Sequence, residues 1–368
     1  MGNIGETTLE IDLSALKHNF NFIKSKLNTS TKFLAVVKAF AYGSDMIAVA
    51  KKLESLKVDY FAVAYTKEGV LLRNAGITTP ILVLHPQVAN FKEIIDKFLE
   101  PSIYSLRILK AFLATAKEKK QTNYPVHLKF NTGLNRLGFC VNDINTIIEK
   151  FSSTDAIKIT SVFSHLAASE DKNEREFSLQ QIEKFKKISS LLSEKLGYTP
   201  TRHMLNTSGI LNYSEAQFDM VRSGIGLYGY GNDAAVDLQL LPIATLKTII
   251  SQIHKIKPNE SVGYNRAYKT TAYKKTATLP IGHADGISRH YGNQKSFVYI
   301  NGEKAPIIGN VCMDMIMVDV SHINCKEGDE VIVFGGENSA ETYAKTVNSI
   351  SYEILTEISQ RVERIIKE

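Results

Sequence analysis

Short apolar runs alternate with helical patterns from about residue 14 to residue 229, and this alternation restricts the possible folds more than any other feature. Helical patterns separate most of the runs, at residues 45–56, 91–98, 105–117 and 174–196. An uninterrupted apolar run is typical of a parallel strand buried on both faces. The candidate strands are residues 33–37, 60–64, 81–84, 102–104, 126–130, 159–163, 203–205 and 220–221. Eight strands in about 215 residues predict a (β/α)8 barrel, with a doubly wound open sheet as the alternative.

The pattern changes after Gly231, where β-like runs are separated by turn signals instead of helices. These runs are residues 246–256, 277–281, 297–300 and 331–334, and two helices are expected at 340–348 and 352–367. The dipeptide Asn301-Gly302 between two apolar runs predicts a tight hairpin. We therefore expect a barrel over residues 14–230, and a mainly antiparallel β domain made of residues 231–368 with residues 1–13.

Composition excludes several classes of function. The 44 basic and 38 acidic residues give a net charge of +6 that is spread along all 368 residues. Without a basic stripe or a known module, nucleic-acid binding is not expected. No apolar stretch approaches the ~20 residues of a membrane span, and no secretory signal is recognisable, so we expect a cytoplasmic protein. Three cysteines without CxxC spacing, and histidines without an HExxH motif, predict neither disulfides nor a metal.

Two strand ends carry residues that are unusual for a barrel core. Lys38 follows the first apolar run, where it could extend to solvent or present a desolvated amine for a Schiff base. Arg222 directly follows the last run, two positions before the first glycine of residues 224–229. These match GxGxxG literally, but neither a following helix nor an acidic residue about 20 positions later supports dinucleotide binding. A phosphate site at the end of strand eight and a simple glycine-rich turn are the remaining interpretations.

Several other polar residues near strand ends could have either a functional or a structural role. Lys129 and Arg136 bracket a turn after the fifth strand, and Arg136 could bind a carboxylate or lie in solvent. His165 and His203 lie at strand ends, where a histidine is more often structural than catalytic. The segments 263–268 and 312–314 have spacing that reveals no mechanism.

Five motifs in this order give the chain a resemblance to a known family. They are VVKAFAYG (36–43), FSHLAASED (163–171), VRSGIGLYG (221–229), LPIGHADG (279–286) and GNVCMDM (309–315). Together they resemble the alanine racemases, which are pyridoxal phosphate enzymes of fold type III. The resemblance implies interconversion of L-alanine and D-alanine, supply of D-alanine for peptidoglycan, and an obligate homodimer whose β domains complete each other's active sites.

The resemblance also implies roles for individual residues. Lys38 would bind pyridoxal phosphate as a Schiff base and act as the base on one face of the substrate, with Tyr264 of the partner subunit as the base on the other face. Arg222 would face the pyridine nitrogen, oriented by His203. The remaining cofactor-binding residues would be Tyr42, His165, Asn206, Thr207 (or Ser208 beside it), Gly224 and Ile225.

The substrate carboxylate would be bound by Arg136, supported by Lys129, which many relatives carry as a carbamate. Met313 of the partner chain would offer its backbone amide to the carboxylate, and Asp314 would be a supporting residue. Three positions depart from the family pattern. Gln360 replaces a tyrosine that contacts the phosphate in many relatives, and His283 and Asp45 lie where tyrosine and glycine are common.

The alternatives to an alanine racemase are three. One is a racemase of broader specificity, for example for serine, which His283 near the substrate entrance suggests. The second is a basic amino-acid decarboxylase of the same fold, and the third is a non-catalytic pyridoxal phosphate carrier. Such carriers resemble the barrel alone, whereas this chain has a full β domain containing Tyr264.

Overall fold

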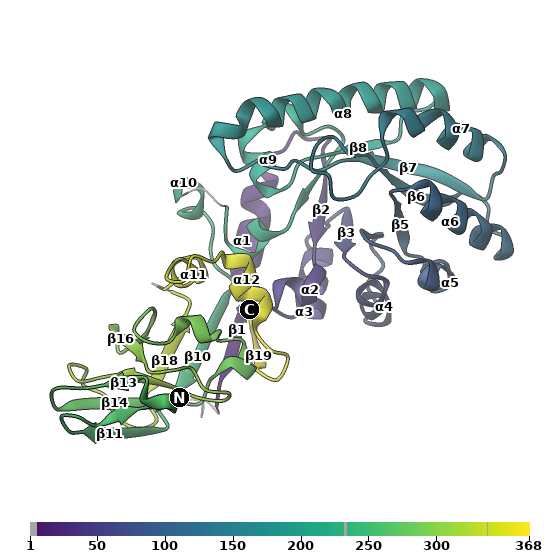
Figure 1. The fold of residues 1–368 in the computed structure, drawn as a ribbon. Coiled ribbons are helices and arrows are strands. Elements are labelled where there is room, and N and C mark those ends of the chain that lie inside the picture. The colour runs from purple at the N-terminus through teal and green to yellow at the C-terminus, as the bar shows by residue number, and fades with distance from the viewer. Residues whose placement is uncertain (1–5, 232–233, 337) are drawn as a thin grey trace.

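The first part of the molecule is a closed barrel with helices around it (Figure 1). The computed structural model describes residues 6–231, 234–336 and 338–368. Within these residues the barrel has eight parallel strands, and β9 closes it by pairing with β2. The strands are β2 (Lys32–Val36), β3 (Tyr60–Val63), β4 (Ile81–Val83), β5 (Glu100–Ile103), β6 (Tyr124–Lys129), β7 (Ile157–Phe163), β8 (Thr201–His203) and β9 (Met220–Ser223). The predicted barrel is confirmed, and the open-sheet alternative is wrong.

Amphipathic helices cover the outside of the barrel. The helix α1 begins where the carboxylate of Asp12 accepts hydrogen bonds from the backbone N–H groups of Ser14 and Ala15. Its buried face includes Leu16 and Phe20. The longer helices of this part are α1 (Leu13–Lys24), α3 (Met46–Ser55), α4 (Thr66–Asn74), α5 (Phe91–Asp96), α6 (Leu106–Glu118), α7 (Ile144–Ser152), α8 (Arg175–Leu196) and α9 (Thr207–Asn212). Over the described part of the chain, no helix has both the length and the apolar character needed to cross a membrane.

The second part is a sheet that is antiparallel except where β1 pairs with β19. Counted over the described ranges it has nine strands, in the order β11-β14-β17-β16-β15-β18-β10-β1-β19. Asn301 and Gly302, both at positive φ, form the predicted hairpin between β15 and β16. The strands are β1 (Thr8–Asp12), β10 (Ala244–Ile249), β11 (Gln252–Ile256), β14 (Lys274–Leu279), β15 (Phe297–Ile300), β16 (Glu303–Ile308), β17 (Ile316–Asp319), β18 (Glu330–Phe334) and β19 (Glu363–Lys367). A separate small hairpin joins β12 (Ser261–Val262) and β13 (Tyr268–Lys269).

Two expectations for this part are wrong. The run 246–256 is two strands, β10 and β11, instead of one. The helix expected over 352–367 ends early, because α12 (Ser351–Glu357) is followed by strand β19. Residues of β19 pair in parallel with β1, more than 350 positions earlier in the chain. That distant strand edge supplies the hydrogen bonds that make β19 extended. The other late helix, α11 (Ala340–Lys345), forms within its expected range.

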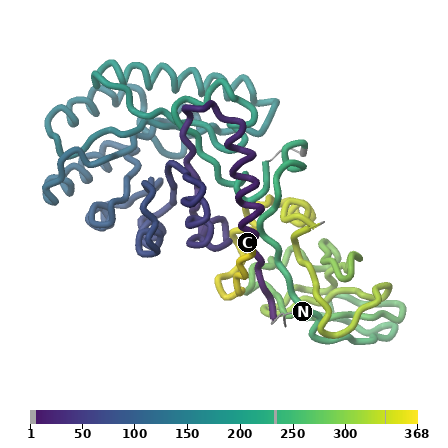
Figure 2. The backbone as a smooth tube through the Cα atoms, turned by 180° about the vertical axis from the view of Figure 1, so that it is seen from behind, coloured from purple at the N-terminus to yellow at the C-terminus, as the bar shows by residue number. Residues whose placement is uncertain are grey.

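The two parts are joined by two chain crossings that lie side by side (Figure 2). The chain starts in the sheet with β1, enters the barrel through α1, and returns after β9 to pair β10 with β1. Asn19 on α1 links the crossings and is fully buried. Its amide donates to the carbonyl oxygens of Leu227 (3.1 Å) and Leu241 (2.7 Å), and its oxygen accepts from the N–H of Leu241 (2.8 Å).

Replacing Asn19 with alanine is expected to lower the free energy of unfolding by about 3 kcal/mol, because it leaves buried backbone groups of both crossings without partners. Chemical denaturation followed by circular dichroism measures this change. The matched control is Asn21→Ala, on the exposed face of the same helix, where a change below about 0.5 kcal/mol is expected. Equal effects of the two substitutions would contradict the role given to Asn19.

Candidate active site

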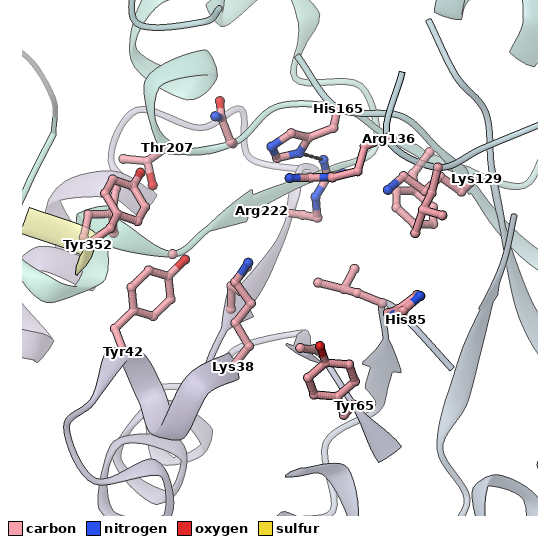
Figure 3. Close-up of a pocket in the computed structure, with 18 residues that line it drawn as sticks. Lys38, Tyr42, Tyr65, His85, Lys129, Arg136, His165, Thr207, Arg222 and Tyr352 are labelled. Carbon is pink, nitrogen blue, oxygen red and sulfur yellow. Dashed lines mark hydrogen bonds between the residues drawn. The ribbon is translucent and has the colours of Figure 1, made fainter. Parts of the chain in front are cut away.

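A cavity of about 710 Å³ opens at the carboxyl ends of the barrel strands, where barrels of this type place their functional residues. Its walls come from segments that follow every barrel strand except β5, together with Tyr352 from α12. Figure 3 shows the side chains pointing into this space. The predicted site residues that line it are Lys38, Tyr42, Lys129, Arg136, His165, Asn206, Thr207, Arg222, Gly224 and Ile225.

Lys38 begins a strained turn directly after β2. The four following residues, 39–42, all have φ between 53° and 55°, which is the left-handed region. Each non-glycine residue there costs about 1–2 kcal/mol. The carboxylate of Glu68 holds the turn in place by accepting hydrogen bonds from the backbone N–H groups of Ala39 (2.6 Å) and Ala64 (2.8 Å). The turn ends at Gly43 (φ 77°), where a Cβ atom would lie 1.8 Å from the carbonyl oxygen of Leu355.

The surroundings of Lys38 favour its neutral amine. The side chain is half-buried, and burial together with the nearby cation Arg136 lowers the pKa of Lys38, while Glu68 opposes the shift. A lysine with a lowered pKa is suited to nucleophilic attack on a carbonyl carbon.

Arg222 lies on β9 and is buried, with its guanidinium anchored by four acceptors. It donates to Nδ1 of His203 (2.8 Å), to Nδ1 of His165 (3.0 Å), and to the carbonyl oxygens of Ser164 (2.7 Å) and Met204 (2.9 Å). The contact with His165 is drawn in Figure 3. Burial and the charge of Arg222 hold the pKa of both histidines well below the usual range, so both are neutral and accept. Burial and Arg136 lower the pKa of Arg222 to about 9, which leaves it charged at neutral pH.

One end of the cavity is built for a compact polar group. Gly224 approaches Tyr42 so closely that a Cβ atom would lie 2.1 Å from the phenol oxygen. Burial raises the pKa of Tyr42, so its hydroxyl stays protonated and can donate. The hydroxyl of Thr207, which contacts Oγ of Ser223 (3.1 Å), and the backbone of Ile225 line the same end.

The opposite side of the cavity contains Lys129 and Arg136. Lys129 is buried at the end of β6, with its Nζ 5.7 Å from the ring centre of Phe163. Burial and the charges of Arg136, Arg222 and Lys38 lower the pKa of Lys129 to about 8. Arg136 is exposed at the edge of the cavity, where a guanidinium can pair with a carboxylate through two parallel hydrogen bonds.

The charge of the lining determines which ligands suit this cavity. Two lysines, two arginines and two histidines line it, and none of the lining residues is a carboxylate. Such a set of donors fits a phosphate ester and a carboxylate together. The glycine cradle beside Tyr42, the donor-only Arg222 and the desolvated amine of Lys38 therefore fit the phosphate, ring nitrogen and aldehyde of pyridoxal phosphate.

Four predicted residues do not line this cavity. His203 is buried behind Arg222, which donates to its Nδ1. Tyr264 and Met313 belong to the sheet part and are 71% and 60% exposed. Asp314 forms an ion pair with Arg361 (2.7 Å), which also binds Asp285 (2.7 Å). Within one chain, the structure does not bring Tyr264 to Lys38.

The sequence analysis missed four residues of the site. Tyr65 and His85 line the cavity directly after β3 and β4. Applying the rule about carboxyl strand ends to every strand would have found them. Glu68 acts on the backbone, and Tyr352 enters from α12, so neither has a signal in the pattern of the barrel.

The three residues that differ from the family pattern lie in different places in the structure. Gln360 is exposed and is not among the lining residues, whereas Tyr352 lines the cavity close to Tyr42, with 6.0 Å between the ring centres. The expected contact of position 360 with a phosphate is therefore not seen. Asp45 caps α3 by accepting from the N–H of Ala48 (2.8 Å). His283 is exposed and lies outside the lining.

Comparisons with known proteins cover nearly the whole chain. The family described as alanine racemase, N-terminal domain, matches residues 11–232, and the one described as alanine racemase, C-terminal domain, matches residues 243–366. An alanine racemase from Halothermothrix orenii is 37% identical over 375 residues, which cover 98% of this chain and 97% of the relative.

Solved structures agree with the sequence matches. An alanine racemase from Clostridium difficile 630 superposes with a TM-score of 0.93 at 37% identity, covering 99% of this chain and 96% of the other. An alanine racemase from Bartonella henselae, solved with covalently bound pyridoxal phosphate, has a TM-score of 0.90 at 27% identity, covering 99% of this chain and 100% of the other. With both halves matched in order and over almost their full length, this chain belongs to the alanine racemase family.

Proposed function

We propose that this protein is a pyridoxal phosphate-dependent alanine racemase, which interconverts L-alanine and D-alanine and supplies D-alanine for peptidoglycan. The observation that carries the proposal is that Lys38 and Arg222 line the same cavity, which has no carboxylate among its lining residues. The chain also belongs to the alanine racemase family. The relative from Bartonella henselae that carries covalently bound pyridoxal phosphate supports the choice of cofactor.

The cofactor is assigned to the residues that fit its parts. Bound through the amine of Lys38, pyridoxal phosphate supplies the electron sink that makes the Cα–H bond of an amino acid acidic. The hydroxyl groups of Tyr42 and Thr207 and the backbone of Gly224 and Ile225 would hold the phosphate. Arg222 offers only donors, so it would hydrogen-bond the ring nitrogen in its unprotonated form. His165 and Asn206 complete the wall, and His203 orients Arg222 from behind.

Racemisation needs a proton removed from one face of Cα and returned on the other, and two bases on opposite faces do this without rearrangement. Lys38 Nζ serves one face. We assign the other face to the phenol oxygen of Tyr264 of the partner subunit. The exposure of Tyr264 and its position outside the cavity of its own chain support this assignment.

The substrate carboxylate is bound by Arg136 and by the backbone amide of the partner's Met313, and Asp314 is a supporting residue. Lys129 supports Arg136 as a carbamate, which replaces a repelling ammonium with an anion. The neutral amine of Lys129 attacks the carbon of CO2. An N–C bond forms, one C=O π bond breaks with its electron pair moving to oxygen, and the nitrogen releases a proton to solvent.

The protein accordingly works as an obligate homodimer. Residues 14–230 bind the cofactor, and residues 1–13 with 231–368 complete the active site of the partner; residues 1–5, 232–233 and 337 of these ranges lie outside the described structure. A cytoplasmic location fits Cys140, Cys312 and Cys325, which form no disulfide among the described residues.

The two-base assignment is tested by hydrogen exchange. In D2O with pyridoxal phosphate, each enantiomer of alanine is expected to gain α-deuterium and to invert, as NMR and optical rotation measure. Lys38→Ala should abolish both. Tyr264→Phe, which removes the phenol oxygen, should slow exchange from one enantiomer by about 100-fold or more. Unchanged exchange from both enantiomers in Tyr264→Phe would exclude Tyr264 as a base.

The shared active site predicts complementation between two inactive variants. Lys38→Ala and Tyr264→Phe are co-refolded in equal amounts, so half of the dimers combine one chain of each kind. In such a dimer one site carries both substitutions and the other carries neither, so about a quarter of the wild-type activity should return. If Tyr264 acted within its own chain, every site would remain defective and no activity would return.

Carbamate formation on Lys129 predicts a pH dependence. Because the pKa of Lys129 is lowered to about 8, its reactive neutral form increases as the pH rises from about 7 to 9. The carbamate signal in 13C NMR with 13C-labelled bicarbonate should increase over the same interval. Lys129→Arg is the control, since a guanidinium keeps its proton. A signal that persisted in this variant would assign the carbamate to another amine.

A further inference from the structure

Two titratable side chains buried inside the barrel take no part in the mechanism described above. His127 on β6 is fully buried, and the side chain of Glu100, the first residue of β5, is 12% exposed. Neither lines the cavity. Both belong to one continuous set of hydrogen bonds that reaches Arg222.

The set takes one residue from each of five consecutive barrel strands. Arg222 on β9 donates to Nδ1 of His203 on β8 (2.8 Å), and Nε2 of His203 contacts Oγ of Ser161 on β7 (2.9 Å). That hydroxyl contacts Nδ1 of His127 (2.5 Å), whose Nε2 contacts the carboxylate of Glu100 (2.6 Å). The set therefore runs from the mouth of the barrel to the amino end of β5.

We propose that Glu100, His127 and Ser161 are positioning residues of the active site, which hold His203, and through it Arg222, in one fixed arrangement of donors and acceptors. The proposal rests on the proposed function, in which Arg222 faces the cofactor. It assigns a task to three residues that touch neither cofactor nor substrate.

The positions of the hydrogens follow from the chemistry of the two ends. A guanidinium has only donors, so Nδ1 of His203 accepts, and the single hydrogen of this neutral ring lies on Nε2. Nε2 of His203 then donates to Ser161. A carboxylate only accepts, so Nε2 of His127 donates to Glu100.

The hydroxyl of Ser161 completes the assignment. It is buried, and its hydrogen-bond contacts in the described structure are the two histidines. Because it accepts from His203, its own hydrogen has one acceptor, Nδ1 of His127. If His127 carried hydrogens on both nitrogens, the hydrogen of Ser161 would have no acceptor among these contacts, a cost that buried polar groups avoid. Every donor therefore points from Arg222 toward Glu100.

This arrangement matters because of the charges at its ends. Arg222 is a buried cation, and no carboxylate among the described residues lies within ion-pair distance of it. Hydrogen bonds in a row polarise one another in a low-dielectric interior. The negative charge of Glu100 thus makes Nδ1 of His203 a stronger acceptor and holds the guanidinium of Arg222 more firmly at its place in the cavity.

The experiment uses the full chain with 15N-labelled histidine rings and needs no cofactor for its first readout. In the wild type, NMR should show one ring hydrogen on each of His127 and His203, on Nε2 in both. Glu100→Gln keeps an acceptor of similar shape but removes the charge, and it should shift the ring resonances of His203 as well as those of His127. Resonances of His203 that stay unchanged, or a doubly protonated His127, would overturn the proposal.

Kinetics of the enzyme loaded with pyridoxal phosphate give the second readout. Ser161→Ala breaks the set in the middle and should lower kcat about tenfold with KM for alanine within about twofold, because the set acts on Arg222 and not on the substrate. The matched control is Ser102→Ala: Ser102 lies beside His127 in the barrel, fully buried, and its hydroxyl has no partner among the described residues. This control should leave kcat and the histidine resonances unchanged.

The outcomes separate the inference from the proposed function. If Ser161→Ala and Ser102→Ala had the same kcat and KM, the hydrogen-bonded set would have only a structural role, and the proposal would be overturned. If Ser161→Ala failed to fold, Glu100→Gln would decide the question by the same two readouts. A wild-type protein without racemase activity would contradict the proposed function, and the ring resonances, which need neither cofactor nor substrate, would still decide whether Glu100 is coupled to His203.

Discussion

Closure of the barrel between β2 and β9 is the constraint on which the site depends. Leu34 on β2 pairs with Arg222 on β9, although 188 positions separate them, and the turn with Lys38 follows directly. The pairing places an amine and a guanidinium at the same end of adjacent strands. The left-handed turn after Lys38 then survives only because its surroundings hold it, through the carboxylate of Glu68 and the close approach of Gly43 to α12. A site of this kind requires a rigid frame, since the turn is unfavourable by itself.

Placing several cationic side chains in one cavity at the carboxyl ends of the barrel strands is electrostatically unfavourable, and the individual residues respond to this in different ways. Burial disfavours the charged forms of Lys38, Lys129 and Arg222, and repulsion by the charge of Arg136 acts on all three in the same direction. Arg222 stays charged because two neutral histidines and two backbone carbonyls accept its hydrogens. The lysines instead move toward their neutral forms, which are the reactive ones. The same electrostatics that would destabilise an empty cavity thus prepares it for anionic ligands.

The sheet is tied to the barrel by more than a linker. Strand β1 lies inside the sheet between β10 and β19, so the start and the end of the described chain complete one layer. Asn19 and the paired crossings fix how α1 leaves this layer. The sheet still presents Tyr264 and Met313 to the outside, away from the cavity of its own chain. This separation is the physical argument for a site completed by a second copy.

The sequence by itself determined the local features: eight buried strands, the hairpin at Asn301-Gly302, and the strand-end residues Lys38 and Arg222, because hydrophobic pattern and turn chemistry act over a few positions. The resemblance drew on motifs that lie along the whole chain and named ten of the residues that line the cavity. Only the tertiary structure decided that 363–367 form strand β19, that Tyr352 lines the cavity while Gln360 does not, and that Glu100 reaches Arg222 through three side chains. These features depend on partners that are distant in the sequence. A strand edge, a cavity wall and a row of hydrogen bonds across five strands exist only once the barrel and the sheet have closed.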